Sequence, residues 1–258
     1  MELSYIKDFV LKHYGINLSA YKSKQLDRRI ENFKNRAGAV SELELINMIS
    51  NDSKLDKKFL DYLTINVSEF FRNKEIFNTL EQKISEVLVP QKNKLKVWSA
   101  ACSNGSEPYS LAMILHKLTP GIRHDIIATD IDITILETAK KGVYCIKDIK
   151  NVDYEFIQKY FTVSGDNYIL KEEIKNRVTF IKHDLIRDIY ESHFDLIVCR
   201  NVVIYFTQEA KNQIYAKFYT AMKPGGLLFV GATESIYNYS EFGFEKLSTF
   251  IYRKAGGN

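Results

Sequence analysis

The spacing of apolar residues along the chain changes near residue 94. Before that point, apolar side chains recur every three or four positions, which is the period of a helix with one buried face. Gly15, Gly38 and Pro90 stand where such segments end. The sequence therefore predicts a helical domain over residues 1–73, followed by a connecting helix and linker over residues 74–93.

From residue 94 to 258, short apolar runs alternate with amphipathic segments. Short apolar strands joined by crossover helices are typical of an α/β parallel sheet that is covered on both faces. The tail, residues 242–254, is expected to add two short strands, one of them antiparallel. The predicted strands are 95–101, 125–130, 178–182, 194–200 and 226–231, and the predicted helices between them are 108–118, 133–141 and 208–222.

One insertion, at about residues 153–176, interrupts this alternation. It contains the turn sequence Ser164-Gly165-Asp166-Asn167 between two apolar runs, which predicts a β hairpin. The second domain, residues 94–258, is therefore expected to contain a small hairpin subdomain.

Polar residues gather where the predicted strands end, which is where open α/β sheets bind their ligands. The turn after the first strand contains one glycine, Gly105, and matches neither the P-loop nor the G-x-G-x-x-G pattern. Asp130 ends the second strand, and a carboxylate there can accept hydrogen bonds from both hydroxyls of a ribose. At this stage, capping of the following helix explains Asp130 equally well. The chain offers two acids here, so Asp130 can bind the ligand while Asp132 caps the helix.

The turn Lys223-Pro224-Gly225-Gly226, before a late strand, is frequent in Rossmann-like methyltransferases that use S-adenosylmethionine. A pyrophosphate needs several closely approaching backbone amides, and therefore several glycines, whereas S-adenosylmethionine contains no phosphate. The glycine-poor first turn thus favours S-adenosylmethionine over a dinucleotide.

Composition narrows the class of protein further. The 258 residues carry a net charge of +4 and only three cysteines, without metal-ligand spacing, so we expect a reduced cytoplasmic protein with no metal site. The N-terminus is charged where a signal peptide is apolar, and the sequence has no apolar run of about 20 residues that could span a bilayer. Residues 20–38 hold six basic and two acidic side chains; this is either a docking surface for an acidic partner or an ordinary solvated face.

Four blocks of sequence resemble the signature blocks of the chemotaxis receptor methyltransferases, the CheR family. They occur in the family's order, and the resemblance covers nearly the whole chain. The blocks are T-I-N-V-S-E-F-F-R (64–72), W-S-A-A-C-S-N-G-S-E-P-Y-S (98–110), A-T-D-I-D (128–132) and C-R-N-V-V-I-Y-F (199–206).

The resemblance implies a Rossmann-like class I methyltransferase sheet and a specific reaction. The family transfers a methyl group from S-adenosylmethionine to glutamate side chains of chemoreceptor cytoplasmic helices, giving glutamate methyl esters and S-adenosylhomocysteine. It implies a cytoplasmic monomer that associates with membrane receptor arrays, with no nucleic-acid partner.

The resemblance also implies roles for individual residues. Arg72 is expected to pair with the methionyl carboxylate, Glu107 with the ammonium group, and Asp130 with the ribose. Tyr205 either faces the reacting methyl group or packs behind Asn201. The remaining implied cofactor contacts are Asn66, Ser68, Asp184, Leu185, Asn201 and Val202, and the implied receptor-docking residues are Arg28, Arg29, Lys34 and Arg36.

Three positions depart from the family pattern. Ser68 stands where threonine is common and keeps the hydroxyl group, whereas Ser106 stands where an acid is common and removes a charge beside Glu107. Asp184 stands where asparagine is common and loses an amide donor near the adenine. The turn 164–167 is short, which favours relatives that need no receptor tether.

Two other functions remain open at this point. One is a non-catalytic S-adenosylmethionine-binding adaptor of receptor arrays. The other is a methyltransferase that acts on RNA or a small molecule, although the sequence contains no RNA-recognition module.

Overall fold

The computed structural model describes residues 3–91 and 94–256, which form two compact units. The helical unit runs up to Asn66 and also includes Tyr205–Asn212, whereas the sheet unit comprises Val67–Ile204 and the chain from Gln213 onward. Residues 92–93 of the predicted linker, and the first and last two residues of the chain, lie outside the described residues.

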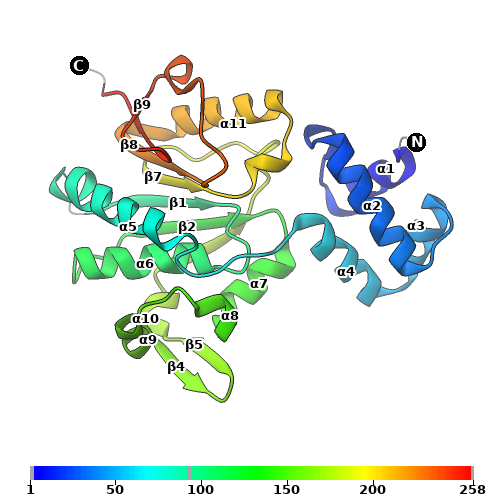
Figure 1. Cartoon of the computed structure of the whole chain (residues 1–258), viewed down its shortest axis with the longest axis horizontal. Coiled ribbons are helices and arrows are strands. Elements are labelled where there is room, and N and C mark those ends of the chain that lie inside the picture. The colour runs from blue at the N-terminus through cyan, green and yellow to red at the C-terminus, as the bar shows by residue number, and fades with distance from the viewer. Residues whose placement is uncertain (1–2, 92–93, 257–258) are drawn as a thin grey trace. The chain divides into compact units, whose positions relative to one another are not determined.

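The helical unit is built from amphipathic helices that enclose an apolar centre (Figure 1). Phe59 is fully buried there and meets the ring of Phe33 edge-on, with 5.0 Å between the ring centroids. Gly15 and Gly38 follow two of the helices in the left-handed conformation, as their positions in the sequence predict. The helices are α1 (Ser4–Tyr14), η1 (Leu18–Ala20), α2 (Ser23–Ala37), α3 (Glu42–Asn51) and α4 (Ser53–Thr64).

The segment Tyr205–Asn212 is tied to the helical unit by backbone hydrogen bonds. The Lys22 amide donates to the Tyr205 carbonyl oxygen at 2.9 Å, and the Thr207 amide donates to the Ala20 carbonyl oxygen at 2.8 Å. Two sequence-distant segments therefore complete this unit.

The sheet unit contains a seven-stranded sheet with the order β6-β2-β1-β7-β8-β10-β9. The first five strands in that order pair in parallel, and β10 pairs antiparallel to both of its neighbours, as predicted for the tail. The strands are β1 (Lys96–Ala100), β2 (Asp125–Asp130), β6 (Val178–Lys182), β7 (Phe194–Cys199), β8 (Met222–Val230), β9 (Phe244–Lys246) and β10 (Ile251–Lys254).

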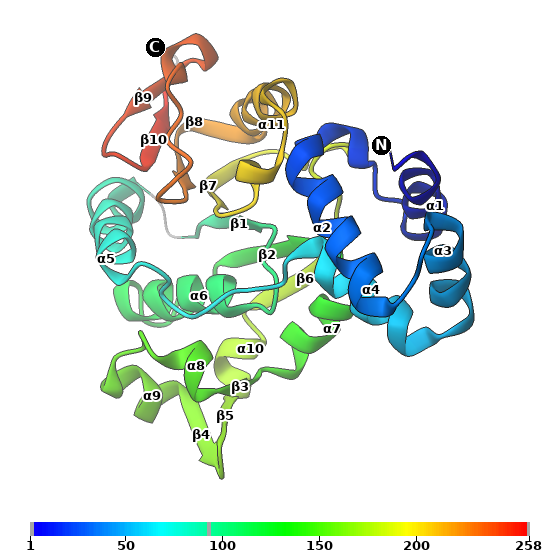
Figure 2. The ribbon, with the colours of Figure 1, turned by 45° about the vertical axis from the view of Figure 1, so that its right-hand side comes forward.

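Helices cover both faces of this sheet (Figures 1 and 2). Val97 of β1 packs towards α5 and α6 in the main core, whereas the next residue, Trp98, packs against Phe218 of α11 at a centroid distance of 5.4 Å. This alternation is what a strand buried on both faces requires. The connecting elements are α5 (Lys74–Lys83), η2 (Ile84–Leu88), η3 (Val89–Gln91), α6 (Ser106–Leu118), α7 (Ile133–Lys141), η4 (Val203–Tyr205), α11 (Gln208–Ala221) and η5 (Tyr239–Phe242).

The predicted hairpin is present and belongs to a second, three-stranded sheet with the order β3-β5-β4. Its strands are β3 (Val143–Cys145), β4 (Phe161–Ser164) and β5 (Asn167–Leu170). The sequence did not predict β3, nor the short helices around the hairpin, α8 (Ile146–Ile149), α9 (Tyr154–Tyr160) and α10 (Glu172–Lys175).

Candidate functional site

The turn between β1 and α6 is held in an unusual backbone conformation. Ala101 and Ser103 have φ angles of 65° and 50°, and Gly105 has a φ of 84°. A Cβ atom on Gly105 would lie 2.9 Å from Cβ of Ala139. Such strain in non-glycine residues persists where the surrounding structure enforces it, commonly at binding sites. Close packing against Ala139 thus requires glycine at position 105. This requirement does not depend on a bound phosphate.

Asp130 lies at the end of β2 beside this turn, and only 8% of it is exposed. Its Oδ2 accepts a hydrogen bond from the Ser103 amide at 2.8 Å, and its Oδ1 accepts one from the Asp132 amide at 3.1 Å. Each carboxylate oxygen can accept two hydrogen bonds, so capacity remains on both oxygens. Burial raises the pKa of Asp130 to about 6, against the lowering effect of these amides. Asp132 is the residue that caps α7.

Glu107 lies in the first turn of α6 and is almost completely buried. Its Oε1 accepts a hydrogen bond from the Ser99 hydroxyl at 2.8 Å, and its Oε2 lies 3.5 Å from Nη1 of Arg200. Burial raises the pKa of Glu107, and Arg200 and Ser99 counteract that effect. A buried carboxylate of this kind suits a cationic ligand group, because its charge is only partly compensated.

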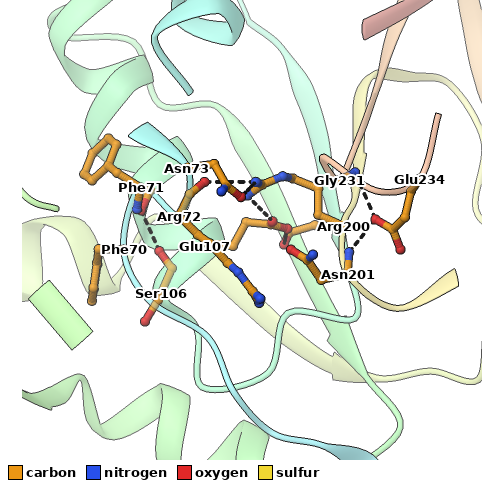
Figure 3. Close-up of polar contacts among 12 residues, drawn as sticks. Phe70, Phe71, Arg72, Asn73, Ser106, Glu107, Arg200, Asn201, Gly231 and Glu234 are labelled. Carbon is orange, nitrogen blue, oxygen red and sulfur yellow. Dashed lines mark hydrogen bonds and ion pairs between the residues drawn. The ribbon is translucent and has the colours of Figure 1, made fainter. Parts of the chain in front are cut away.

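The segment that carries Arg72 is anchored to the sheet unit through its backbone (Figure 3). The Phe71 amide donates to the Ser110 hydroxyl at 3.0 Å, and Nη2 of Arg200 donates to the Arg72 carbonyl oxygen at 2.9 Å. Phe70 and Phe71 are buried. Within the part of the chain that the structure describes, the Arg72 guanidinium makes one long hydrogen bond, 3.4 Å to the Val67 carbonyl oxygen. Most of its five donors remain available for a ligand carboxylate.

Asn201 and Val202 follow β7 and are held by Glu234, a buried acid in the turn after β8. The Glu234 carboxylate accepts hydrogen bonds from the amides of Asn201, Gly231 and Ile204. Asn201 has a φ of 60°, and a Cβ atom on Gly231 would lie 2.2 Å from Oε2 of Glu234. Figure 3 shows the Glu234 carboxylate pointing at the backbone amides of Asn201 and Gly231.

The other predicted cofactor contacts have different surroundings. Oδ1 of Asp184 accepts hydrogen bonds from the amides of Ile186 and Arg187, at 2.7 and 3.3 Å, so this carboxylate holds the turn after β6. Leu185 is buried within that turn, and Ser68 is half-buried in the sheet unit. Asn66 and Tyr205 both belong to the helical unit. Their cofactor contacts and the catalytic assignment of Tyr205 stay predictions.

The four predicted docking residues lie on α2 and differ in their contacts. Arg28 and Arg36 are exposed, whereas Lys34 is half-buried and lies 2.7 Å from Oε2 of Glu31. Arg29 donates a hydrogen bond to the Tyr62 carbonyl oxygen, and its guanidinium lies 4.8 Å from the centroid of the Tyr62 ring. Arg29 thus holds α2 against α4. The exposed basic residues of this segment are Lys22, which directly precedes α2, and Lys24, Arg28 and Arg36 within it.

Two residues that the sequence analysis left out of the site are central to its structure. Arg200 joins Glu107 to the Arg72 segment, and Glu234 holds the Asn201 turn. Arg200 was visible as a basic residue at a strand end. Glu234 lies four residues beyond the end of β8, and the sequence alone does not mark a polar residue at that distance from a strand.

Comparison with known proteins identifies the family. Residues 66–251 match the family model of the CheR methyltransferase SAM binding domain, and residues 1–64 match that of the CheR methyltransferase all-alpha domain. The chain belongs to the CheR methyltransferase family. It is therefore a methyltransferase of chemotaxis that binds S-adenosylmethionine, as the four sequence blocks predicted.

The similarity to named relatives extends over most of the chain. A chemotaxis protein methyltransferase of Listeria innocua is 40% identical over 252 residues, 97% of this chain and 96% of its own length. Chemotaxis protein methyltransferase 1 of Pseudomonas aeruginosa is 34% identical over 89% of this chain and 88% of its own length. The chemotaxis protein methyltransferase of Escherichia coli is 32% identical over 89% of this chain and 82% of its own length.

No helix in residues 3–91 and 94–256 is both long and apolar enough to cross a membrane.

Proposed function

We propose that this methyltransferase esterifies glutamate side chains on the cytoplasmic helices of chemoreceptors, for chemotactic adaptation. The observation that carries the proposal is that the family match covers both the methyltransferase domain and the all-alpha domain. The chain is thus similar along its length to proteins named chemotaxis protein methyltransferase. The family's protein-glutamate chemistry is the reaction to test.

Three charged residues of the sheet unit are chemically complementary to groups of S-adenosylmethionine. Arg72 offers a planar set of donors for the methionyl carboxylate, and buried Glu107 offers an acceptor for the ammonium group. Asp130 retains acceptor capacity for the ribose hydroxyls. When bound, the cofactor supplies an electrophilic methyl group on a sulfonium.

A glutamate acceptor needs no general base. Its carboxylate has a reference pKa of about 4.3, so it is ionised and nucleophilic at neutral pH. The task left to the protein is to align the carboxylate with the methyl group and to remove its water, and good alignment can contribute about 7–11 kcal/mol. No residue of the site, including Glu107 and Asp130, therefore has to act as a catalytic base. One C–O bond forms, the C–S bond breaks, and S-adenosylhomocysteine leaves.

In this proposal the exposed basic residues of α2 bind an acidic face of the receptor. Lys22 directly precedes α2, and Lys24, Arg28 and Arg36 lie on it; all four are exposed. Complementary charge increases the rate of encounter and fixes the orientation of the partner more than it increases affinity. The same surface would bring the protein to membrane receptor arrays.

The decisive experiment uses methyl-labelled S-adenosylmethionine and receptor-containing membranes. Labelled receptor that releases methanol on mild alkali, with the label lost when receptor glutamates are replaced by alanine, is the expected result. Alkali-stable label would contradict the proposal and indicate N-methylation or C-methylation. Binding of the cofactor without any transfer would instead favour the non-catalytic adaptor.

A further inference from the structure

Arg200, at the end of β7, is a buried cation with partners from two distant parts of the chain. Its side chain is 1% exposed, and its guanidinium packs on two aromatic rings, 5.0 Å from the Phe77 centroid and 4.9 Å from the Phe229 centroid. Burial lowers its pKa, and Glu107 and Glu234 counteract that effect. A fully buried arginine is costly to keep unless it makes specific contacts. Apolar packing alone does not explain this residue.

The two ends of the guanidinium contact different segments. Nη2 donates to the Arg72 carbonyl oxygen at 2.9 Å and to Oδ1 of Asn73 at 3.1 Å, while Nη1 faces Oε2 of Glu107 at 3.5 Å (Figure 3). Arg72 and Arg200 are 128 residues apart. One rigid, planar group therefore sets the spacing between the Arg72 backbone and the Glu107 carboxylate.

The backbone on both sides of Arg72 is strained and has to be held in place by contacts. Phe71 and Asn73 on either side of it have φ angles of 48° and 61°, a conformation that L-residues adopt at a cost. The hydrogen bonds from Arg200 fall on Arg72 and Asn73, within this strained segment. Their loss would allow the segment to relax and would leave Glu107 buried without its cation.

We propose that Arg200 is a positioning residue for recognition of the amino-acid end of S-adenosylmethionine. Arg200 holds the Glu107 carboxylate and the Arg72 backbone at the spacing at which their side chains bind the ammonium and carboxylate of the methionyl group. The inference rests on the roles proposed above for Arg72 and Glu107. It concerns the binding of the cofactor alone and does not depend on the methyl acceptor.

Two ligands separate this role from a purely structural one. S-adenosylhomocysteine carries the amino-acid group, whereas 5′-methylthioadenosine has the same adenine, ribose and thioether sulfur without it. Calorimetric titration of both ligands into wild type and Arg200→Lys measures whether the substitution weakens binding of the amino-acid group or of the whole ligand. Lysine keeps the charge but cannot reach Glu107 and the Arg72 carbonyl oxygen together.

We expect Arg200→Lys to weaken S-adenosylhomocysteine binding about 10- to 50-fold, from the loss of charge-assisted hydrogen bonds, and to change methylthioadenosine binding less than about 2-fold. Equal losses for the two ligands, or no loss for either, would overturn the proposal. A wild type that binds both ligands equally would also overturn it, because the amino-acid end would then not be recognised. The control is Arg253→Lys, at a half-exposed arginine that contacts Glu245 on the neighbouring strand.

A second variant tests the proposal if Arg200→Lys does not fold. Asn73→Gly removes one acceptor of Arg200 and keeps the backbone, because glycine readily adopts the φ of 61°. The Asn73 side chain makes no capping hydrogen bond to α5, so that helix keeps its start. A loss of about 3-fold for S-adenosylhomocysteine, with methylthioadenosine unchanged, is expected from one weakened hydrogen bond. Unchanged affinity for both ligands would overturn the proposal. The failure of methyl transfer to receptors, in contrast, would leave these binding results intact.

Discussion

The Ser103 amide donates a 2.8 Å hydrogen bond to Oδ2 of Asp130, from a backbone conformation that serine rarely adopts. The bond joins the turn after β1 to the end of β2. It also occupies one of the positions at which the Asp130 carboxylate can accept a hydrogen bond. Burial raises the pKa of this carboxyl to about 6. The Asp130 carboxylate is therefore the group through which pH should change the binding of the cofactor.

The first prediction concerns pH. Ionised Asp130 can accept both ribose hydroxyls, and protonation removes acceptor capacity, so affinity for S-adenosylhomocysteine should be full above pH 7 and fall as pH decreases through about 6. Because the folded pKa lies above the ordinary 3.8, the loss starts at a higher pH than for an exposed aspartate. Titration calorimetry between pH 7.5 and 5.5 measures it.

The control for this prediction is the 2′,3′-dideoxy analogue of the same ligand. It keeps the amino-acid group, and therefore any contribution from Glu107, but has no ribose hydroxyls to donate. Its affinity should vary less with pH in this window. An identical pH profile for the two ligands would show that Asp130 does not bind the ribose.

The second prediction separates close packing from backbone strain. Gly105 and Gly121 have similar φ angles, 84° and 86°, but a Cβ atom on Gly105 would meet Ala139 at 2.9 Å, whereas one on Gly121 would meet nothing within 4 Å. Gly121→Ala should lower the free energy of unfolding by about 1–2 kcal/mol through backbone strain alone. Gly105→Ala should lower it by about 1–3 kcal/mol more through overpacking. Urea denaturation checks both, and equal losses would contradict the packing argument.

The third prediction tests Arg72. Replacing a guanidinium that binds a carboxylate removes a charge-assisted contact worth about 1.5–3 kcal/mol, so Arg72→Ala should weaken S-adenosylmethionine binding about 10- to 100-fold. Decarboxylated S-adenosylmethionine should bind the wild type and the variant equally, because it lacks the group that Arg72 would bind. The matched control is Lys74→Ala, which removes a nearby exposed cation that pairs with Asp153. Unchanged affinity for S-adenosylmethionine in Arg72→Ala would remove the assigned role.

The main sheet could be predicted from sequence because its strands are continuous apolar runs. The predicted bounds 125–130 and 178–182 are those of β2 and β6. The strand β3 and the short helices α8–α10 could not be predicted, because three to seven residues with no apolar run or turn signal show no helical or strand period. Tertiary contacts stabilise them instead. The Phe70 amide, for example, donates to the Asp148 carbonyl oxygen at 2.9 Å.

In the candidate site, individual residues could be predicted from the sequence, but the contacts between distant residues could not. Asp130 and Glu107 could be found because strand ends and helix starts are visible in a pattern of apolar and polar residues. The pairing of Arg200 with Glu107 and the Arg72 segment could not, since it joins residues about a hundred positions apart. Likewise, charge alone suggested that Arg28 and Arg29 were equivalent, and only the contact with Tyr62 distinguishes them.

That distinction gives the fourth prediction. Arg28 is exposed on α2, so Arg28→Glu should raise the KM for receptor several-fold and leave the affinity for S-adenosylmethionine and the thermal stability unchanged. The increase should shrink at high salt, because interactions between exposed charges are screened over about 10 Å at 0.1 M. Arg29→Met should instead lower the thermal stability, because Arg29 bonds the Tyr62 carbonyl oxygen and packs on its ring. If neither Arg28→Glu nor Arg36→Glu changed the receptor KM, the two exposed arginines of α2 would be excluded as docking residues.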